Sequence, residues 1–309
     1  MGSVIEYLIM ATLRMGIPVA LTAAGACLSE RTGVLNIGLE GMMSMGAFVA
    51  VAGSYLTGNP WLGVLFAIIA GVIMSAIHGF VTIICGGAMG VSAQALVLLA
   101  TGFCSVGLQL VFNSFGVSAQ VANIATTEFL RPIPVIGPYL ADLSPIVYIA
   151  FIILFGVHYL LYKTPLGLRM QACGEHPRAA DTAGVNVNKL RFVGVLISGA
   201  LGGLGGAFLS VGSMNLFQEG MIAGRGYLAV GAVIMGRWTP VGAFGAALCF
   251  GFFDALQLYL QSVPNAPIPS QFIQMIPYVA SLLVLTFTIR GATGPAASGR
   301  SYSTIAGTK

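Results

Sequence analysis

Nine runs of apolar residues, separated by short stretches rich in Gly, Pro and charge, limit what this chain can fold into. Their approximate bounds are 4–26, 42–57, 61–84, 93–112, 144–162, 192–212, 227–237, 241–260 and 271–289. A helix needs about 20 apolar residues to cross a bilayer. The run 227–237 supplies only about 16 Å of helix, so it is tilted, extended by its neighbours or re-entrant. We therefore expect an all-α polytopic membrane protein with about eight or nine transmembrane helices, some of them short or broken.

The charge content excludes a soluble fold. Only 7% of the residues are charged and 57% are hydrophobic, whereas soluble domains carry about 25% charged residues. We expect one transmembrane domain over 1–290, embedded in the lipid bilayer, and a flexible cytoplasmic tail over 291–309. The net charge of +4 is small and gives no indication of nucleic-acid binding.

The distribution of basic residues predicts the orientation. The longest charged loop, 163–191, holds five Lys or Arg against Glu175 and Asp181. Loops with excess Lys and Arg face the cytoplasm. With this loop inside and 227–237 counted as a crossing, most of the 13 Lys and Arg residues are cytoplasmic. The N-terminus then lies outside and the C-terminus inside.

No pattern typical of an enzyme is present. The three His and five Cys residues are scattered, with no spacing suited to a metal, so we expect no catalytic residue, metal or cofactor. The Gly-rich stretch 199–208 lacks the Gly-Lys-Ser/Thr ending of a phosphate-binding loop. Its Gly pairs, four residues apart, instead predict a helix face for close packing.

Two polar, Gly-rich segments interrupt the apolar runs, at 30–48 and 217–233. Shifting the first by 185 residues aligns Glu40 with Arg225, Gly41 with Gly226, Gly46 with Gly231 and Ala47 with Ala232. The predicted topology runs the two helices in opposite directions. This arrangement favours an inverted repeat with a central site between broken helices.

Charged and amide side chains at membrane depth are costly, so they are expected to face protein or a water-filled path. The residues predicted to line a translocation path are Asn36, Glu40, Phe217, Glu219 and Arg225. For Asp254, Gln257 and Gln261, a polar helix seam and a path lining both remain open. Glu30 and Arg31 are expected to be interfacial anchors. Aromatic side chains beside amides suit a flat, uncharged, hydrogen-bonding solute.

The loop 163–192, called the docking loop below, is much longer than a helix connection needs, so we expect a partner to dock on it. Its middle part, 177–183, is predicted to form a short helix, with Pro177 in the first turn and Gly184 as the stop signal. Ala179, Ala180 and Ala183 would give this helix a smooth face.

Three segments carry a family resemblance: GLRMQACGEHPRAADTAGV, ERTGVLNIGLEGMMSMGAF and GRGYLAVGAVIMGRWTPVGA. They resemble permease subunits of bacterial ABC importers for ribose-type sugars and nucleosides, and the nucleoside branch most of all. The resemblance implies a plasma-membrane permease that couples to a separate ATPase, receives solute from an external binding protein and pairs with a second, different permease. The residues expected at the ATPase contact are Glu175, Arg178, Ala180 and Gly184. Family members often carry a basic residue in the turn after the third span, whereas 85–96 has no charge.

The sequence also fits rival functions. An importer of pentoses or branched-chain amino acids would use the same architecture, and Arg225 could pair with an amino-acid carboxylate. A secondary transporter or channel would keep the polar residues at membrane depth but would have no use for the docking loop.

Overall fold

A computed structural model describes residues 2–124, 141–262, 269–288 and 293–302, and its regular elements in these ranges are helices. The helices are α1 Gly2–Arg31, α2 Leu39–Thr57, α3 Pro60–Gly79, α4 Met89–Phe112, α6 Pro145–Lys163, α7 Pro165–Glu175, α8 Pro177–Thr182, α9 Val187–Leu209, α10 Arg225–Met235, α11 Pro240–Ser262 and α12 Ser270–Thr288. Two π-helical turns, η1 Phe80–Ile84 and η3 Ser210–Met214, continue α3 and α9.

The helices agree with the predicted spans. Within the described ranges, seven helices are long and apolar enough to cross a membrane, while α10 and the apolar part of α12 are shorter. Each of the nine apolar runs corresponds to one helix, so the prediction of a polytopic all-α membrane protein is confirmed. The short run 227–237 is α10, which has 11 residues.

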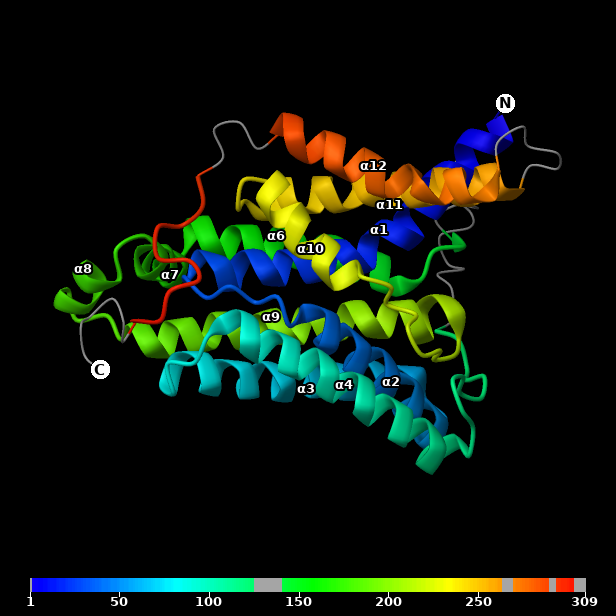
Figure 1. Ribbon diagram of the computed structural model, residues 1–309, viewed down its shortest axis with the longest axis horizontal. Coiled ribbons are helices and arrows are strands. Elements are labelled where there is room, and N and C mark those ends of the chain that lie inside the picture. The colour runs from blue at the N-terminus through cyan, green and yellow to red at the C-terminus, as the bar shows by residue number, and fades with distance from the viewer. Residues whose placement is uncertain (1, 125–140, 263–268, 289–292, 303–309) are drawn as a thin grey trace.

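Helix α9 occupies the middle of the bundle, between α1 on one side and α2 and α3 on the other (Figure 1). Its glycines allow this packing. A Cβ on Gly203 would overlap the carbonyl oxygen of Ala67 in α3, and a Cβ on Gly206 would overlap that of Met43 in α2. The predicted close-packing face is therefore confirmed, and it fixes the position of α2 against α9.

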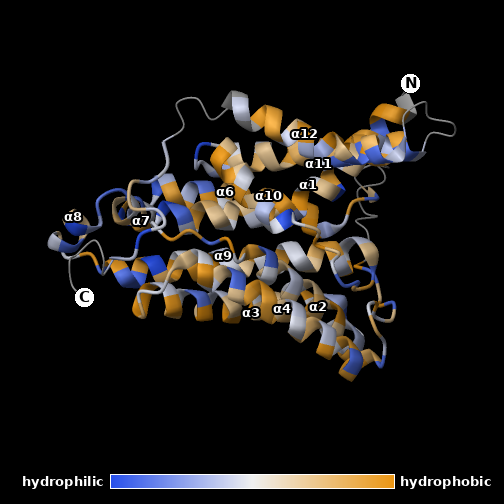
Figure 2. Ribbon diagram, in the orientation of Figure 1, coloured by the Kyte–Doolittle hydropathy of each residue, from blue (hydrophilic) through white to orange (hydrophobic). Residues whose placement is uncertain are grey.

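Large apolar side chains cover the outside of the bundle. Leu98 and Leu110 on α4 are 74% and 80% exposed, and Ile152 on α6 is 70% exposed. Figure 2 shows apolar residues along the helices and hydrophilic residues mainly toward the ends of the bundle, α8 among them. Apolar surface of this extent is unfavourable in water, and it suits contact with lipid or another membrane subunit.

Helices α2 and α10 both begin inside the bundle and run toward opposite ends of it (Figure 1). Each follows a non-helical segment, and each has a Gly at the N-cap, Gly38 and Gly224 respectively. Shifted by 185 residues, the start of α2 at Leu39 falls one residue before the start of α10 at Arg225. This antiparallel pair of helix starts supports the predicted inverted repeat.

The two ends of the molecule differ in character. The N-terminus lies at one end, and α7, α8 and residues 293–302 lie at the other (Figure 1). Residues 293–302, part of the predicted tail, fold onto this loop: Ala297 N donates to the Gly174 carbonyl (2.9 Å), and Tyr302 Oη donates to Asp181 Oδ2 (2.8 Å). The rest of the predicted tail lies outside the described residues.

Candidate functional site

Glu40 stands where α2 and α10 meet. It lies in the first turn of α2, and its two carboxylate oxygens accept hydrogen bonds from the backbone of the other helix start: Oε1 from Gly224 N (2.9 Å) and Oε2 from Gly226 N (2.8 Å). The first backbone N–H groups of a helix lack partners within the helix and carry partial positive charge. The carboxylate of Glu40, on α2, therefore caps the start of α10, which belongs to the other half of the predicted repeat.

Glycine is required on the α10 side of this contact. A Cβ on Gly226 would overlap the backbone of Glu40, so only a residue without a side chain allows the two helix starts to approach this closely. Gly224 adopts φ +82°, a left-handed conformation that glycine tolerates best.

A cavity of about 150 Å³, called the Glu40 cavity below, opens beside this contact. Its walls include Glu40, Phe217 and Glu219, together with Ser44, Val97, Thr101, Cys104 and Ile222. Phe217 is 1% exposed and packs edge-on against Phe48, with ring centroids 5.5 Å apart. The structure thus brings together three of the five predicted path residues at one cavity with both charged and aromatic walls.

Hydrogen bonds to the segment after α4 hold Phe217 and Glu219 in place. Phe217 N donates to Ser118 Oγ (2.8 Å), Ser118 N donates to the Phe217 carbonyl (2.8 Å), and Glu219 N donates to the Gly116 carbonyl (2.8 Å). The sequence does not indicate this supporting role of Ser118, because its partner lies 99 residues away.

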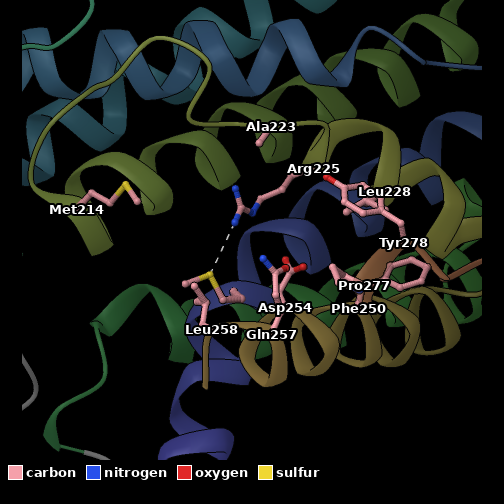
Figure 3. Close-up of a pocket in the computed structure, with 11 residues that line it drawn as sticks. Met214, Ala223, Arg225, Leu228, Phe250, Asp254, Gln257, Leu258, Pro277 and Tyr278 are labelled. Atoms are coloured by element: carbon pink, nitrogen blue, oxygen red, sulfur yellow. Dashed lines mark hydrogen bonds between the residues drawn. The ribbon is translucent and has the colours of Figure 1, made fainter. Parts of the chain in front are cut away.

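Arg225 faces a different cavity, of about 260 Å³, bordered by α1, α10, α11 and α12. Figure 3 shows its guanidinium above Asp254 and Gln257, which project from neighbouring turns of α11. The guanidinium donates to the carbonyls of Met221 (3.1 Å) and Ile222 (3.3 Å). Asp254 and Gln257 thus line a cavity, whereas Gln261 is not among its lining residues. A part of these residues in a translocation path stays a prediction.

Asn36 lines neither cavity. It is 1% exposed, and its Nδ2 donates to Ser198 Oγ in α9 (3.2 Å) and contacts Met42 Sδ (3.5 Å). It therefore attaches the unwound segment before α2 to the central helix. Its position suits the support of the site and not contact with a solute in either cavity.

The docking loop forms the predicted short helix, α8, which starts at Pro177 and is followed by Gly184 at φ +82°. Glu175, Arg178 and Gly184 are exposed. Ala180 is 5% exposed and packs against Cys173 and Val187 of its own chain, so it faces inward. Pro177 and Gly184 predicted the short helix from sequence, but the sequence did not show which face of α8 turns inward.

Glu175 connects the docking loop to two other parts of the chain. Its Oε1 lies 3.8 Å from Arg31 Nη1 at the end of α1, and its Oε2 accepts from Ala296 N (3.3 Å). Nearby, burial raises the pKa of the Cys173 thiol. In the part of the chain that the structure describes, no group of three or more His, Cys, Asp or Glu side chains could hold a metal ion.

Comparison with known proteins supplies the family. The chain is 38% identical to the guanosine ABC transporter permease protein NupQ of Bacillus subtilis, covering 97% of both chains. It is 36% identical to the nucleoside ABC transporter permease protein NupC of Lactococcus lactis, covering 92% of this chain and 93% of that one. It is 34% identical to the putative glucose ABC transporter permease protein TsgC13 of Haloferax volcanii, covering 91% of both. No solved structure gives a significant match.

The match to a family extends over nearly the whole membrane domain. Residues 8–287 match the family described as branched-chain amino acid transport system / permease component. This range includes all three segments that carried the resemblance and both candidate cavities. The chain therefore belongs to this family of transport-system permeases.

Proposed function

We propose that this permease carries nucleosides across the membrane as one subunit of an ATP-driven importer. The observation that carries the proposal is the end-to-end similarity to two permeases named for guanosine and for nucleosides. The Glu40 cavity suits such a solute, because the buried ring of Phe217 stands in its wall beside the polar side chains of Glu40, Glu219 and Thr101. A nucleoside presents a flat ring with donors and acceptors on its edges and on its ribose.

Within this proposal the five path residues take different roles. Glu40, Phe217 and Glu219 line the path at the first cavity. Arg225, with Asp254 and Gln257, lines the second cavity. Asn36 supports the start of α2 through Ser198. Access to the path would alternate between the two sides of the membrane as the partner ATPase binds and hydrolyses ATP.

The proposal includes three protein partners. An ATPase would dock in the cytoplasm on the exposed side of α8, at Arg178 and Gly184, with Glu175 at the edge of the contact. A binding protein would deliver solute from outside. A second permease would complete the channel, and two organisms each contain a pair of permeases similar to this chain: NupC and NupB at 36% and 25% identity, NupQ and NupP at 38% and 24%.

Two other solutes have specific support. The similarity to a permease named for glucose favours a sugar. The family description and Arg225, a partner for a carboxylate, favour a branched-chain amino acid. Uncoupled transport has less support, because the relatives are named as ABC transporter permeases.

Uptake by cells with and without the gene tests the proposal. We expect gene-dependent uptake of labelled guanosine, adenosine or uridine that stops on ATP depletion and that unlabelled ribose and leucine leave unchanged. Nucleoside uptake that does not depend on the gene would overturn the nucleoside assignment, and labelled ribose and leucine would then be tested in the same cells.

A further inference from the structure

Helix α10 is held at both ends by side chains from the N-terminal part of the chain. At its start, Glu40 accepts the hydrogen bonds of Gly224 and Gly226 described above. At its end, the chain turns through Arg237 and Trp238 into α11. Trp238 there contacts three residues in the last turns of α1.

We call this second contact the Trp238 clamp, formed by Cys27, Glu30, Arg31 and Trp238. The indole Nε1 donates to Glu30 Oε2 (2.5 Å). The Trp238 carbonyl accepts from Arg31 Nε (2.7 Å) and from Cys27 Sγ (3.1 Å). Glu30 is 2% exposed, and its Oε1 has no partner among the described residues. Glu30 is therefore buried in a specific contact with Trp238, whereas the sequence predicted an interfacial anchor at this position.

The turn inside the clamp has an unfavourable backbone. Arg237 and Trp238 both have φ +52°, a left-handed conformation that costs a non-glycine residue about 1 kcal/mol or more. Such a conformation persists only where surrounding contacts hold it, and it is common at elements that move. The hydrogen bonds from α1 supply those contacts here.

The clamp also touches the docking loop. Arg31 uses its Nε on Trp238 and directs Nη1 toward Glu175, at the end of α7 and two residues before α8. A Cβ on Gly174 would overlap the carbonyl of Arg31, so α7 and the end of α1 are in backbone contact. A displacement of α7 and α8 therefore acts directly on Arg31.

We propose that α10 transmits the position of the docking loop to the Glu40 cavity, with Glu30, Arg31 and Trp238 as positioning residues. The inference rests on the proposed coupling to an ATPase. Eleven helical residues form a rigid segment of about 16 Å. A shift of Trp238 therefore displaces Gly224 and Gly226, and with them the hydrogen bonds to Glu40 that close one wall of the cavity.

The test uses the complete importer, with its ATPase, second permease and binding protein, reconstituted in proteoliposomes. Both ATP hydrolysis and nucleoside accumulation are measured, and their ratio gives the coupling. Trp238→Phe removes the indole donor, and Arg31→Gln removes both the bond to Trp238 and the charge facing Glu175. We expect each variant to co-purify with the ATPase and to hydrolyse ATP, while nucleoside transported per ATP falls at least about fivefold, the lower range of allosteric coupling energies.

Two controls separate this role from a general loss of structure. Trp61→Phe makes the same change at an exposed position in α3 and should leave the ratio unchanged. Glu175→Gln is also measured alone, because Glu175 accepts from Ala296 N as well and lies at the edge of the proposed ATPase contact. The loss in the double variant Arg31→Gln/Glu175→Gln should be smaller than the sum of the two single losses, because residues that share a contact are not additive. If Trp238→Phe does not assemble, Arg31→Gln and the double variant decide the question.

The outcomes distinguish this inference from the proposed function. If the wild-type importer accumulates no nucleoside, the proposed function fails. If the wild type transports and the assembled variants keep its ratio of transport to ATP hydrolysis, α10 does not transmit the position of the loop, and this inference is wrong.

Discussion

The sequence predicted a place at membrane depth for Glu40, but it did not show which groups Glu40 contacts. Its presence in an apolar, Gly-rich stretch indicated a role at membrane depth, because an unpaired charge there is costly. Its partners, the amides of Gly224 and Gly226, lie 184 and 186 residues away. The same holds for Glu30 and Trp238, whose contact spans 208 residues. Neither a backbone donor nor a side-chain donor this far along the chain can be recognised as a partner from the sequence, so such pairs become visible only in the fold.

Replacing Glu40 by Gln should impair transport more than assembly. The amide keeps one acceptor oxygen and places an NH₂ group against a backbone N–H, so one of the two hydrogen bonds is lost and the other is no longer charge-assisted. We expect the nucleoside transport rate to fall roughly tenfold, with normal expression in the membrane. Glu6→Gln, near the N-terminus, serves as the control. A Glu40→Gln rate equal to that of the wild type would show that the cap of α10 has no part in transport.

Cys173 and Cys85 should differ in reactivity. Cys173 is buried under α8 and the tail, and this burial raises the pKa of its thiol; Cys85 is exposed. Because the thiolate is the reactive form, a raised pKa keeps Cys173 protonated at neutral pH and its labelling begins only at higher pH. With maleimide at pH 7 and mass spectrometry, we expect label on Cys85 and almost none on Cys173. Tyr302→Phe, which removes the bond to Asp181, should speed labelling of Cys173. Equal rates at the two cysteines in the unmodified chain would contradict the packing of residues 293–302.

At the scale of elements, hydropathy predicted the helices because the bilayer sets both their length and their composition. The nine runs and the short helix at 227–237 followed from this constraint. The inward face of α8 did not, because α8 has only six residues and small side chains on several sides. The division of the predicted path residues between two cavities was not visible in the sequence either, because the direction of Arg225 depends on how α10 packs against α11.

The central position of α9 predicts a strong effect of small substitutions. Gly203→Ala places a methyl group against the carbonyl of Ala67, whereas Gly156→Ala in α6 enters open space. Overpacking typically costs about 1–3 kcal/mol, so we expect Gly203→Ala to lower the melting temperature of the purified protein by several degrees. Gly156→Ala should leave it unchanged or raise it slightly, because Ala is the better helix former. Equal melting temperatures would argue against the close contact of α9 with α3.

At the scale of the whole molecule, the predicted orientation depends on the basic residues of the docking loop, which lie at one end of the bundle. The basic docking loop and residues 293–302 share one end, and the N-terminus lies at the other. With that loop in the cytoplasm, a reporter fused after Lys309 should be active inside the cell, and one fused before Met1 should be active outside. Both reporters on one side would require an even number of crossings and would contradict the account of α10 as a crossing helix.

The most direct test of the central claim is ATP-driven accumulation of labelled guanosine in proteoliposomes that contain the complete importer. We expect guanosine to accumulate above its external concentration only when both ATP and the binding protein are present, and Glu40→Gln to reduce this accumulation strongly. Equilibration of guanosine without ATP, or ATP hydrolysis without guanosine movement, would contradict it.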